Sequence, residues 1–233
     1  MVKALDDELQ NRCGRCGSCI GKPILQPSDN VELMASATRF LTDTEIPLKC
    51  KIMVPPEAFP IYGFEGKIPV SQHAQTGRIL SDWGDAGWGT DVLHGKHELW
   101  YSDKLVEAVV NLYRRWQTHP TPEWITCIPS NSKPRLVAGF TERLSIKLGL
   151  PFRPVIIKVK ENQPQKAQEN RYHQCRNLDG VFEIETPIPK GAVLLIDDVF
   201  DSGWTMTIAA ALLRRAGSGP VWPLALATSK GRG

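Results

Sequence analysis

The fold of this 233-residue chain is decided by the stretch Val193-Leu194-Leu195-Ile196-Asp197-Asp198-Val199-Phe200-Asp201-Ser202-Gly203-Trp204-Thr205. Its first four residues are apolar and two of them are β-branched, which predicts a strand buried on both faces. After the acid pair and a turn with Gly203, good helix formers follow from Thr205 to Arg215, and Gly217 is placed to end the helix. A strand, two acids, a short loop and a helix together predict an anion site with carboxylates on its rim.

Elementary chemistry narrows the ligand of this loop to a phosphorylated sugar. Unpaired N–H groups at a helix start bind phosphate, and the hydroxyls of Ser202 and Thr205 can add hydrogen bonds. Gly203 lets the backbone approach closely. Asp197 and Asp198 would repel the phosphate if they faced it, so we expect them to accept bonds from sugar hydroxyls or to hold a hard cation. A sugar phosphate with Mg²⁺ satisfies all of these conditions.

The stretch resembles the phosphoribosyl-pyrophosphate motif of type I phosphoribosyltransferases, in which apolar residues, two acids, two spacers and a Thr/Asp-Thr/Ser-Gly-x-Thr loop follow one another. The order acid, hydroxyl, glycine in 201–205 is most similar to the 6-oxopurine branch. The resemblance implies that Asp197 and Asp198 meet the ribose hydroxyls, that 201–205 hold the 5′-phosphate, and that Asp201 is a general base toward a nucleobase. Trp204 stands where the family usually has a smaller residue. Acid pairs at strand ends also occur in receiver domains and nucleotide-hydrolysing folds.

Length and composition fit a cytoplasmic protein with one large or two small domains. The net charge of +3 with 23% charged residues does not indicate a protein whose main role is to bind polyanions. The sequence has no apolar run of the roughly 18 residues that span a bilayer and no signal-peptide core at its start, so we expect no membrane contact. A homo-oligomer is among the arrangements that the sequence allows.

A cysteine cluster predicts a metal site in the first 24 residues. Cys13, Cys16 and Cys19 are three of six cysteines, and this spacing in a reducing compartment indicates Zn²⁺ binding rather than disulfides. Structural zinc takes four ligands, and Cys50 or His73 could supply the fourth only at an atypical spacing. The same run also begins one kind of iron–sulfur motif. Incidental thiols in a tail are the alternative.

The segment from Ala4 through the three cysteines to Ile20 resembles the end of the zinc-binding module that follows the motors of RecQ-type DNA helicases. In that family another zinc cysteine lies well upstream of the other three, before the point where this sequence starts. One clade of bacterial RecQ-like helicases also carries a phosphoribosyltransferase-like domain at its C-terminus. The resemblance therefore implies that the chain is the C-terminal part of such a helicase and meets DNA through it.

Residues 25–97 are expected to form a small accessory module that acts as a hood over the phosphoribosyl site. The alternation in 48–54 predicts a half-exposed strand, and 75–80 a short helix. Trp83 to Gly89 predict a tight aromatic corner, which favours core packing over base stacking on nucleic acid.

From residue 98 to 233 the pattern predicts an α/β phosphoribosyltransferase-like domain with a parallel sheet flanked by helices. A helix opening at Ser102 is followed by a buried strand over 124–129. The next loop opens at the carboxyl edge, where ligands bind. By its place it resembles the family's pyrophosphate loop, with Ser130, Lys133 and Arg135 as ligand contacts. A solvated surface loop is the alternative.

A helix over 136–149, a strand over 155–159, a strand over 181–184 and a last strand over 221–227 complete the prediction. Residues 160–179 are polar and match in position the loop that closes over the reaction in the family. Closure would bring Lys166 or Arg171 to the leaving pyrophosphate.

Two functions follow from these residues. The first is transfer of a phosphoribosyl group from phosphoribosyl pyrophosphate, with Mg²⁺, to a base or amine. The alternative is a non-catalytic module of the helicase that senses a nucleotide, docks, or binds DNA. The chain carries no Gly-x-x-x-x-Gly-Lys-Ser/Thr loop, so no helicase activity is expected of it alone.

Overall fold

The computed structural model describes residues 14–15, 17–21, 30–160 and 171–229, and it divides into two units, 1–37 and 38–233. The first unit holds the short helix α1 (Gly17–Ile20) and the start of α2 (Val31–Asp43). The second unit holds every strand of the described residues. Within this described part, every helix is too short or too polar to cross a lipid bilayer.

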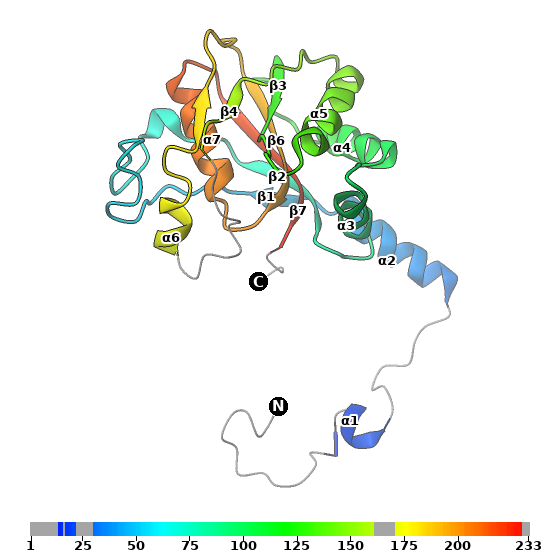
Figure 1. Ribbon diagram of the computed structural model, residues 1–233. Coiled ribbons are helices and arrows are strands. Elements are labelled where there is room, and N and C mark those ends of the chain that lie inside the picture. The colour runs from blue at the N-terminus through cyan, green and yellow to red at the C-terminus, as the bar shows by residue number, and fades with distance from the viewer. Residues whose placement is uncertain (1–13, 16, 22–29, 161–170, 230–233) are drawn as a thin grey trace. The chain divides into compact units, whose positions relative to one another are not determined.

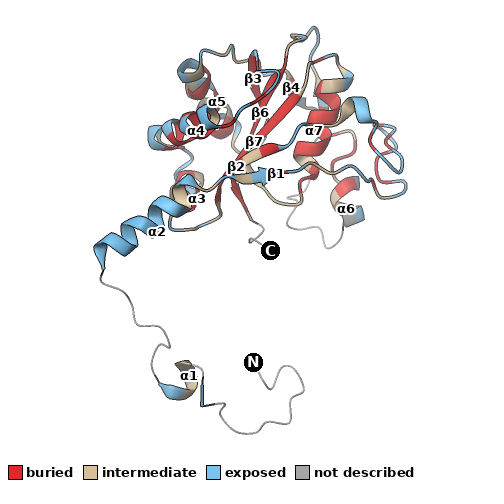
Figure 2. Ribbon diagram, turned by 180° about the vertical axis from the view of Figure 1, so that it is seen from behind, coloured by how far each residue is buried: buried red, intermediate tan, exposed pale blue. Residues whose placement is uncertain are grey.

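The second unit is built on a five-stranded, mostly parallel sheet, which confirms the predicted α/β class (Figure 1). Its order is β1-β2-β7-β6-β3, and only the edge pair β1–β2 is antiparallel. The strands are β1 (Ile46–Leu48), β2 (Gly77–Asp82), β3 (Trp124–Cys127), β6 (Val193–Phe200) and β7 (Val221–Thr228). The central strands β7 and β6 are buried over 221–228 and 193–196 because helices cover both faces (Figure 2).

Helices α3 (Gly89–Glu98), α4 (Asp103–Arg115) and α5 (Pro134–Leu148) gather on one side of the sheet, and α7 (Trp204–Arg215) on the other (Figure 1). Side chains along β6 alternate between the two faces of the sheet, and each face packs against its own group of helices. Val193 and Leu195 belong to the apolar cluster with α7. Leu194 and Ile196 belong to the cluster with α4 and α5.

The adjacent strands β3 and β6 send their following helices to opposite faces of the sheet. After β3 the chain enters α5, and after β6 it enters α7, which pack in the two different apolar clusters. The two loops therefore diverge at the carboxyl edge and leave a crevice between them. In open parallel sheets such a switch point is where ligands bind.

Several predicted elements are confirmed within a residue or two. The helix expected after Ser102 is α4, with Ser102 as its N-cap. The helix expected to end at Gly149 is α5, and Gly149 adopts φ 68°, as a left-handed C-cap does. This helix begins at Pro134 rather than Leu136 because proline suits the first helical turn.

Two expectations for the N-terminal third are wrong. Residues 77–82 form β2 rather than a helix, since they pair with β7 in the sheet interior. The strand expected over 48–54 is instead β1, which ends at Leu48, and the following chain makes only an isolated bridge at Met53. At β2, tertiary pairing outweighs local propensity.

Residues 38–97 share the sheet and the core of the residues that follow, whereas the sequence favoured a separate module over 25–97. Strands β1 and β2 extend the same sheet as β7. Phe59 and Phe64 lie in the cluster that contains α7, and the Phe59 ring lies 5.9 Å from that of Trp204. The 3-10 turn η2 (Val70–Gln72) also packs on α7.

The strands expected over 155–159 and 181–184 are present as β4 (Ile156–Lys158) and β5 (Phe182–Ile184). They pair with each other, antiparallel, in a sheet of their own and do not join the parallel sheet. The polar segment between them includes α6 (Arg171–Arg176), while residues 161–170 lie outside the described residues.

We predict that Trp204→Ala lowers the free energy of unfolding by about 3–5 kcal/mol, because the side chain is 2% exposed and its removal leaves a cavity under the loop. Ile146→Ala, at a side chain that is 75% exposed, is the control and should change stability by less than about 0.5 kcal/mol. Urea unfolding measures both, and equal losses would contradict the burial of Trp204.

Candidate functional site at the carboxyl edge of the sheet

A cavity of about 880 Å³ opens at the carboxyl edge of the parallel strands. Its lining comes from the ends of the strands and the loops that follow them. The polar and charged lining residues are Lys96, His97, Ser130, Asn131, Ser132, Lys133, Lys158, Asp197, Asp198, Asp201, Ser202 and Thr205. The crevice at the switch point therefore brings together most of the residues that the sequence singled out.

The loop between β6 and α7 has the geometry of a phosphate cradle. Gly203 is the N-cap of α7 with φ 85°, and a side chain there would meet the Phe200 ring at 2.8 Å. Ser202 Oγ accepts a long bond of 3.4 Å from the N–H of Trp204, and the Ser202 and Thr205 side chains line the cavity. Glycine is required because the turn is left-handed and crowded. Gly203, Thr205 and Met206 line the cavity, so the unpaired N–H groups of this helix start lie beside it.

The acid pair ends the apolar part of β6 and lies in the cavity wall. Asp197 Oδ1 accepts the N–H of Asp198 at 2.8 Å. Although Asp197 keeps some exposed surface, protein atoms crowd its carboxylate, and this burial together with the charge of Asp198 raises its pKa to about 8. Such a shift is typical of functional carboxylates rather than solvated surface acids.

Asp198 is held by two residues from the α3 region. Lys96 Nζ lies 2.8 Å from Asp198 Oδ2, and the Tyr101 hydroxyl donates to the same oxygen at 3.0 Å. Burial, then the Asp198 charge, raises the pKa of Tyr101 far above its usual range, so Tyr101 serves as a donor. The sequence did not predict α3, and Lys96 was missed for that reason. A lysine two residues before Glu98 gave no recognisable signal.

The loop between β3 and α5 lines the same cavity as the acid pair. Lys133 Nζ donates to the carbonyl oxygen of Lys96 at 2.8 Å, and the Lys133 N–H donates to Ser130 Oγ at 3.2 Å. Ser130 and Lys133 both line the cavity, as predicted for ligand contacts. Arg135 lies exposed in the first turn of α5 and is not part of the lining.

Of the other predicted site residues, one lines the cavity and the rest do not lie in the described part of its wall. Asp201 lines the cavity, and its Oδ1 accepts a bond of 2.7 Å from Ser229 Oγ. The Trp204 side chain turns into the core beside Phe59 and leaves the cavity free. Lys166 lies outside the described residues, and of Arg171 only the helical backbone is described.

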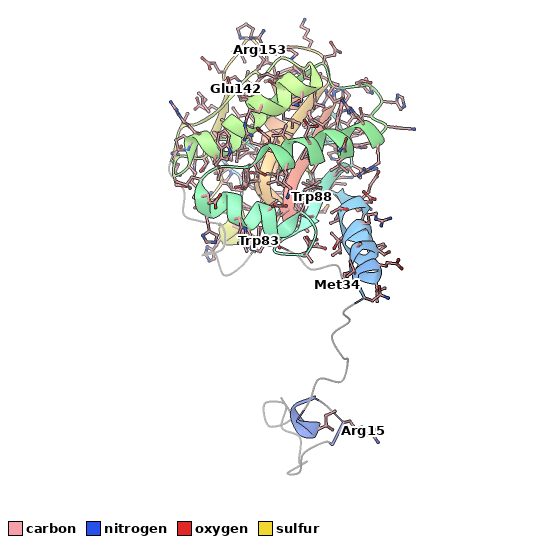
Figure 3. All side chains as sticks on the ribbon, turned by 90° about the vertical axis from the view of Figure 1, so that its right-hand side faces the viewer. Arg15, Met34, Trp83, Trp88, Glu142 and Arg153 are labelled. Carbon is pink, nitrogen blue, oxygen red and sulfur yellow. The ribbon has the colours of Figure 1, made fainter. Side chains whose placement is uncertain are left out.

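Sequence reasoning missed part of the cavity wall. Trp83 follows β2, and its ring lies 5.9 Å from Lys96 Nζ. The turn from Trp83 to Trp88, in which Figure 3 labels both tryptophans, is held by Asp85, whose carboxylate accepts the N–H groups of Gly87 and Gly89 at 3.0 and 2.9 Å. The tight corner was thus predicted, but its place beside the site depends on the sheet order.

No group of three or more His, Cys, Asp and Glu side chains that could hold a metal occurs among the described residues. Cys13 and Cys16 lie outside the described residues, and Cys19 is half-buried in α1. Asp197 and Asp198 fit a hard cation that also takes ligand oxygens, because a cation would offset the burial and the charge repulsion that raise the Asp197 pKa.

Comparisons with known proteins add three structural likenesses. No protein-family model and no curated protein matches the sequence. Adenine phosphoribosyltransferase from Trypanosoma brucei, solved with AMP, pyrophosphate and ribose-5-phosphate, is 16% identical, with a TM-score of 0.37 over 59% of this chain and 66% of that one. The chain therefore spans just under two thirds of that enzyme.

Adenine phosphoribosyltransferases of Leishmania tarentolae and Leishmania donovani are also 16% identical, with TM-scores of 0.38 and 0.36. The first likeness covers 83% of this chain and 87% of that one, and the second 82% and 79%. Because all three TM-scores lie below 0.5, the chemistry of this chain must be inferred from its own residues.

We predict that Asp197→Asn makes the protein more stable above neutral pH. The folded-state pKa of Asp197, about 8, exceeds its ordinary value of 3.8, so the folded form holds the proton more tightly and the wild type loses stability as the pH rises between these values. The Asp197→Asn variant cannot titrate at this position, so its free energy of unfolding lacks this decrease with rising pH. Unfolding in urea between pH 5 and pH 8.5 measures this pH dependence, with Asp91→Asn, a half-buried acid of α3 outside the cavity lining, as a control. Parallel curves for all three proteins would contradict the assignment.

Proposed function

We propose that this chain is a phosphoribosyltransferase-like domain that binds phosphoribosyl pyrophosphate, or the 5′-phosphate of a nucleotide, together with Mg²⁺. One observation carries the proposal: a single cavity holds the start of α7, the acid pair of β6 and Lys133 of the facing loop. An amide cradle, two carboxylates and a cation on the opposite side match, in order, a phosphate, a sugar with hydroxyls and a second phosphate group.

In this proposal the ligand lies across the switch point. The 5′-phosphate takes the N–H groups and hydroxyls of 201–205, and the ribose hydroxyls donate to Asp197 and Asp198. The diphosphate takes Ser130 and Lys133. Arg135, which is exposed, is proposed as an outer cation for the diphosphate, and Lys166 and Arg171 are proposed to reach the leaving group from the segment after β4.

The reaction would be a displacement at the anomeric carbon. A nitrogen of the acceptor base or amine forms the new bond to this carbon as the bond to the diphosphate oxygen breaks, and the electron pair leaves with pyrophosphate. Asp201 takes the proton that the nitrogen releases. Lys133 and the helix start stabilise charge on the phosphate groups through positions that are set in advance. Bound Mg²⁺ would supply neutralisation of diphosphate and ribose oxygens.

The wider setting is part of the proposal. We propose that the chain is the C-terminal part of a cytoplasmic RecQ-like helicase and carries the end of its Zn²⁺ module. The cysteine run at 13–19 supports this proposal. The attached helicase, rather than this chain, would then bind the DNA. The cavity itself offers contacts for one nucleotide-sized ligand.

A non-catalytic sensor of nucleotides is the second candidate, and one contact favours it. Ser229 Oγ donates to Asp201 Oδ1 at 2.7 Å, so one oxygen of the proposed base already has a partner. A carboxylate oxygen that already accepts a bond from the protein has less capacity to accept one from a ligand. Binding would then occur without transfer.

We predict that Asp197→Asn combined with Asp198→Asn abolishes Mg²⁺-dependent binding of phosphoribosyl pyrophosphate, because amides cannot replace two carboxylates toward hydroxyls and a cation. Titration calorimetry with and without Mg²⁺ measures the affinity. Asp43→Asn with Asp91→Asn is the matched control and should bind as the wild type does. Unchanged affinity in the double site variant would remove the ribose assignment.

We predict that Asp201→Asn lowers the transfer rate by about 10²- to 10⁴-fold while changing ligand affinity little, as expected for loss of a general base. Pyrophosphate release across a panel of bases gives the rate, and calorimetry the affinity. Equal losses in both would argue against the base. Tight binding by the wild type without release from any base would select the sensor.

A further inference from the structure

The last turn of α3 contacts both sides of the cavity through one residue. Lys96 Nζ lies 2.8 Å from Asp198 Oδ2 at the end of β6. The carbonyl oxygen of the same residue accepts the Lys133 ammonium, also at 2.8 Å, from the loop after β3. Lys96 thus joins two segments that are 65 residues apart in the sequence, from 133 to 198, and that both line the proposed ligand site.

The contacts at Asp198 fix which of its oxygens is offered to a ligand. Lys96 and the Tyr101 hydroxyl both bind Oδ2, at 2.8 and 3.0 Å, so Oδ1 is the oxygen left for a sugar hydroxyl. The side chains of Asp198 and Lys96 are 14% and 33% exposed, so this ion pair is shielded more than a surface pair. Charge-assisted bonds to a partly buried carboxylate orient it strongly.

The contact at Lys133 orients a cation in the same manner. An ammonium has three N–H donors, and one of them goes to the Lys96 carbonyl. Carbonyls in the last turn of a helix lack intrahelical partners, so this acceptor is available and carries the negative end of the helix dipole. Two donors remain for phosphate oxygens, and the carbonyl holds them toward the cavity.

We propose that Lys96 is a positioning residue that prepares both halves of the site, through its side chain at Asp198 and through its backbone at Lys133. This inference rests on the proposed function for the identity of the ligand. The two halves of the role are separable, because substitution of the side chain removes the ammonium and leaves the carbonyl oxygen in place.

The test is a double-mutant cycle in ligand binding with Lys96→Met, Asp198→Asn and the combined variant. We expect Lys96→Met to weaken binding of ribose 5-phosphate with Mg²⁺ at least about tenfold, as loss of a bond between charged groups does. In the Asp198→Asn background the same change should cost little more, because Lys96 acts through Asp198. Lys96→Arg should recover most of the affinity. A loss of equal size in both backgrounds would overturn the role.

Inorganic pyrophosphate is the second probe and separates positioning from general damage. Its contact with Lys133 depends on the Lys96 carbonyl, so Lys96→Met should weaken its binding less than that of ribose 5-phosphate. Equal weakening of both probes would indicate a merely structural lysine. Lys104→Met, an exposed change of the same charge on α4, should leave both affinities as they are.

Urea unfolding of the same variants tests the inference without any ligand. Lys96→Met should destabilise the wild type more than it destabilises the Asp198→Asn protein, because only the first contains the ion pair. Additive effects would overturn the inference even if ribose 5-phosphate binds. Conversely, a wild type that binds neither probe would refute the proposed function, while a non-additive unfolding cycle would still support Lys96 as the partner of Asp198.

Discussion

The repulsion between two adjacent carboxylates, Asp197 and Asp198, is the constraint on which the site depends. They continue a buried strand and point toward opposite faces of the sheet because side chains alternate along β6. Asp198 meets Lys96 and Tyr101 on the α3 side. Asp197 makes no ion pair among the described contacts; burial and then the charge of Asp198 raise its pKa, and the charge of Lys96 offsets only a smaller part of that rise. The fold stabilises one acid and leaves the other dependent on a proton or a ligand.

Two adjacent, partly buried carboxylates destabilise the folded state, so the packing around them must offset this free-energy cost. The strand before it is fully buried between two apolar clusters, and Trp204 seals the loop after it from below. These contacts hold the loop against the core, where Gly203 adopts the left-handed conformation that the turn requires. Rigid placement of groups that repel each other is how a site prepares for a ligand with complementary charges.

The sequence predicted what is local in this molecule and missed what depends on strand order. The β6 stretch, the α7 start, the Ser130–Lys133 loop and the Gly149 cap follow from residue chemistry within a few positions, and the structure has them there. Strand β2 was read as a helix, since its partner β7 lies about 145 residues downstream and no local pattern announces that pairing. The helix α3, which follows β2 closely in the chain, was not predicted either, and Lys96 was therefore missed.

This dependence explains why residues 38–97 belong to the site rather than only cover it. Once β2 lies beside β7, its carboxyl end must open at the same edge as those of β6 and β3 because the three strands run parallel to it in one sheet. The chain leaving that edge carries Trp83 and α3 directly to the cavity wall. A cation delivered there compensates Asp198 without a residue from the ligand loops. The motif alone thus defines which groups bind, while the sheet order determines which groups hold them in place.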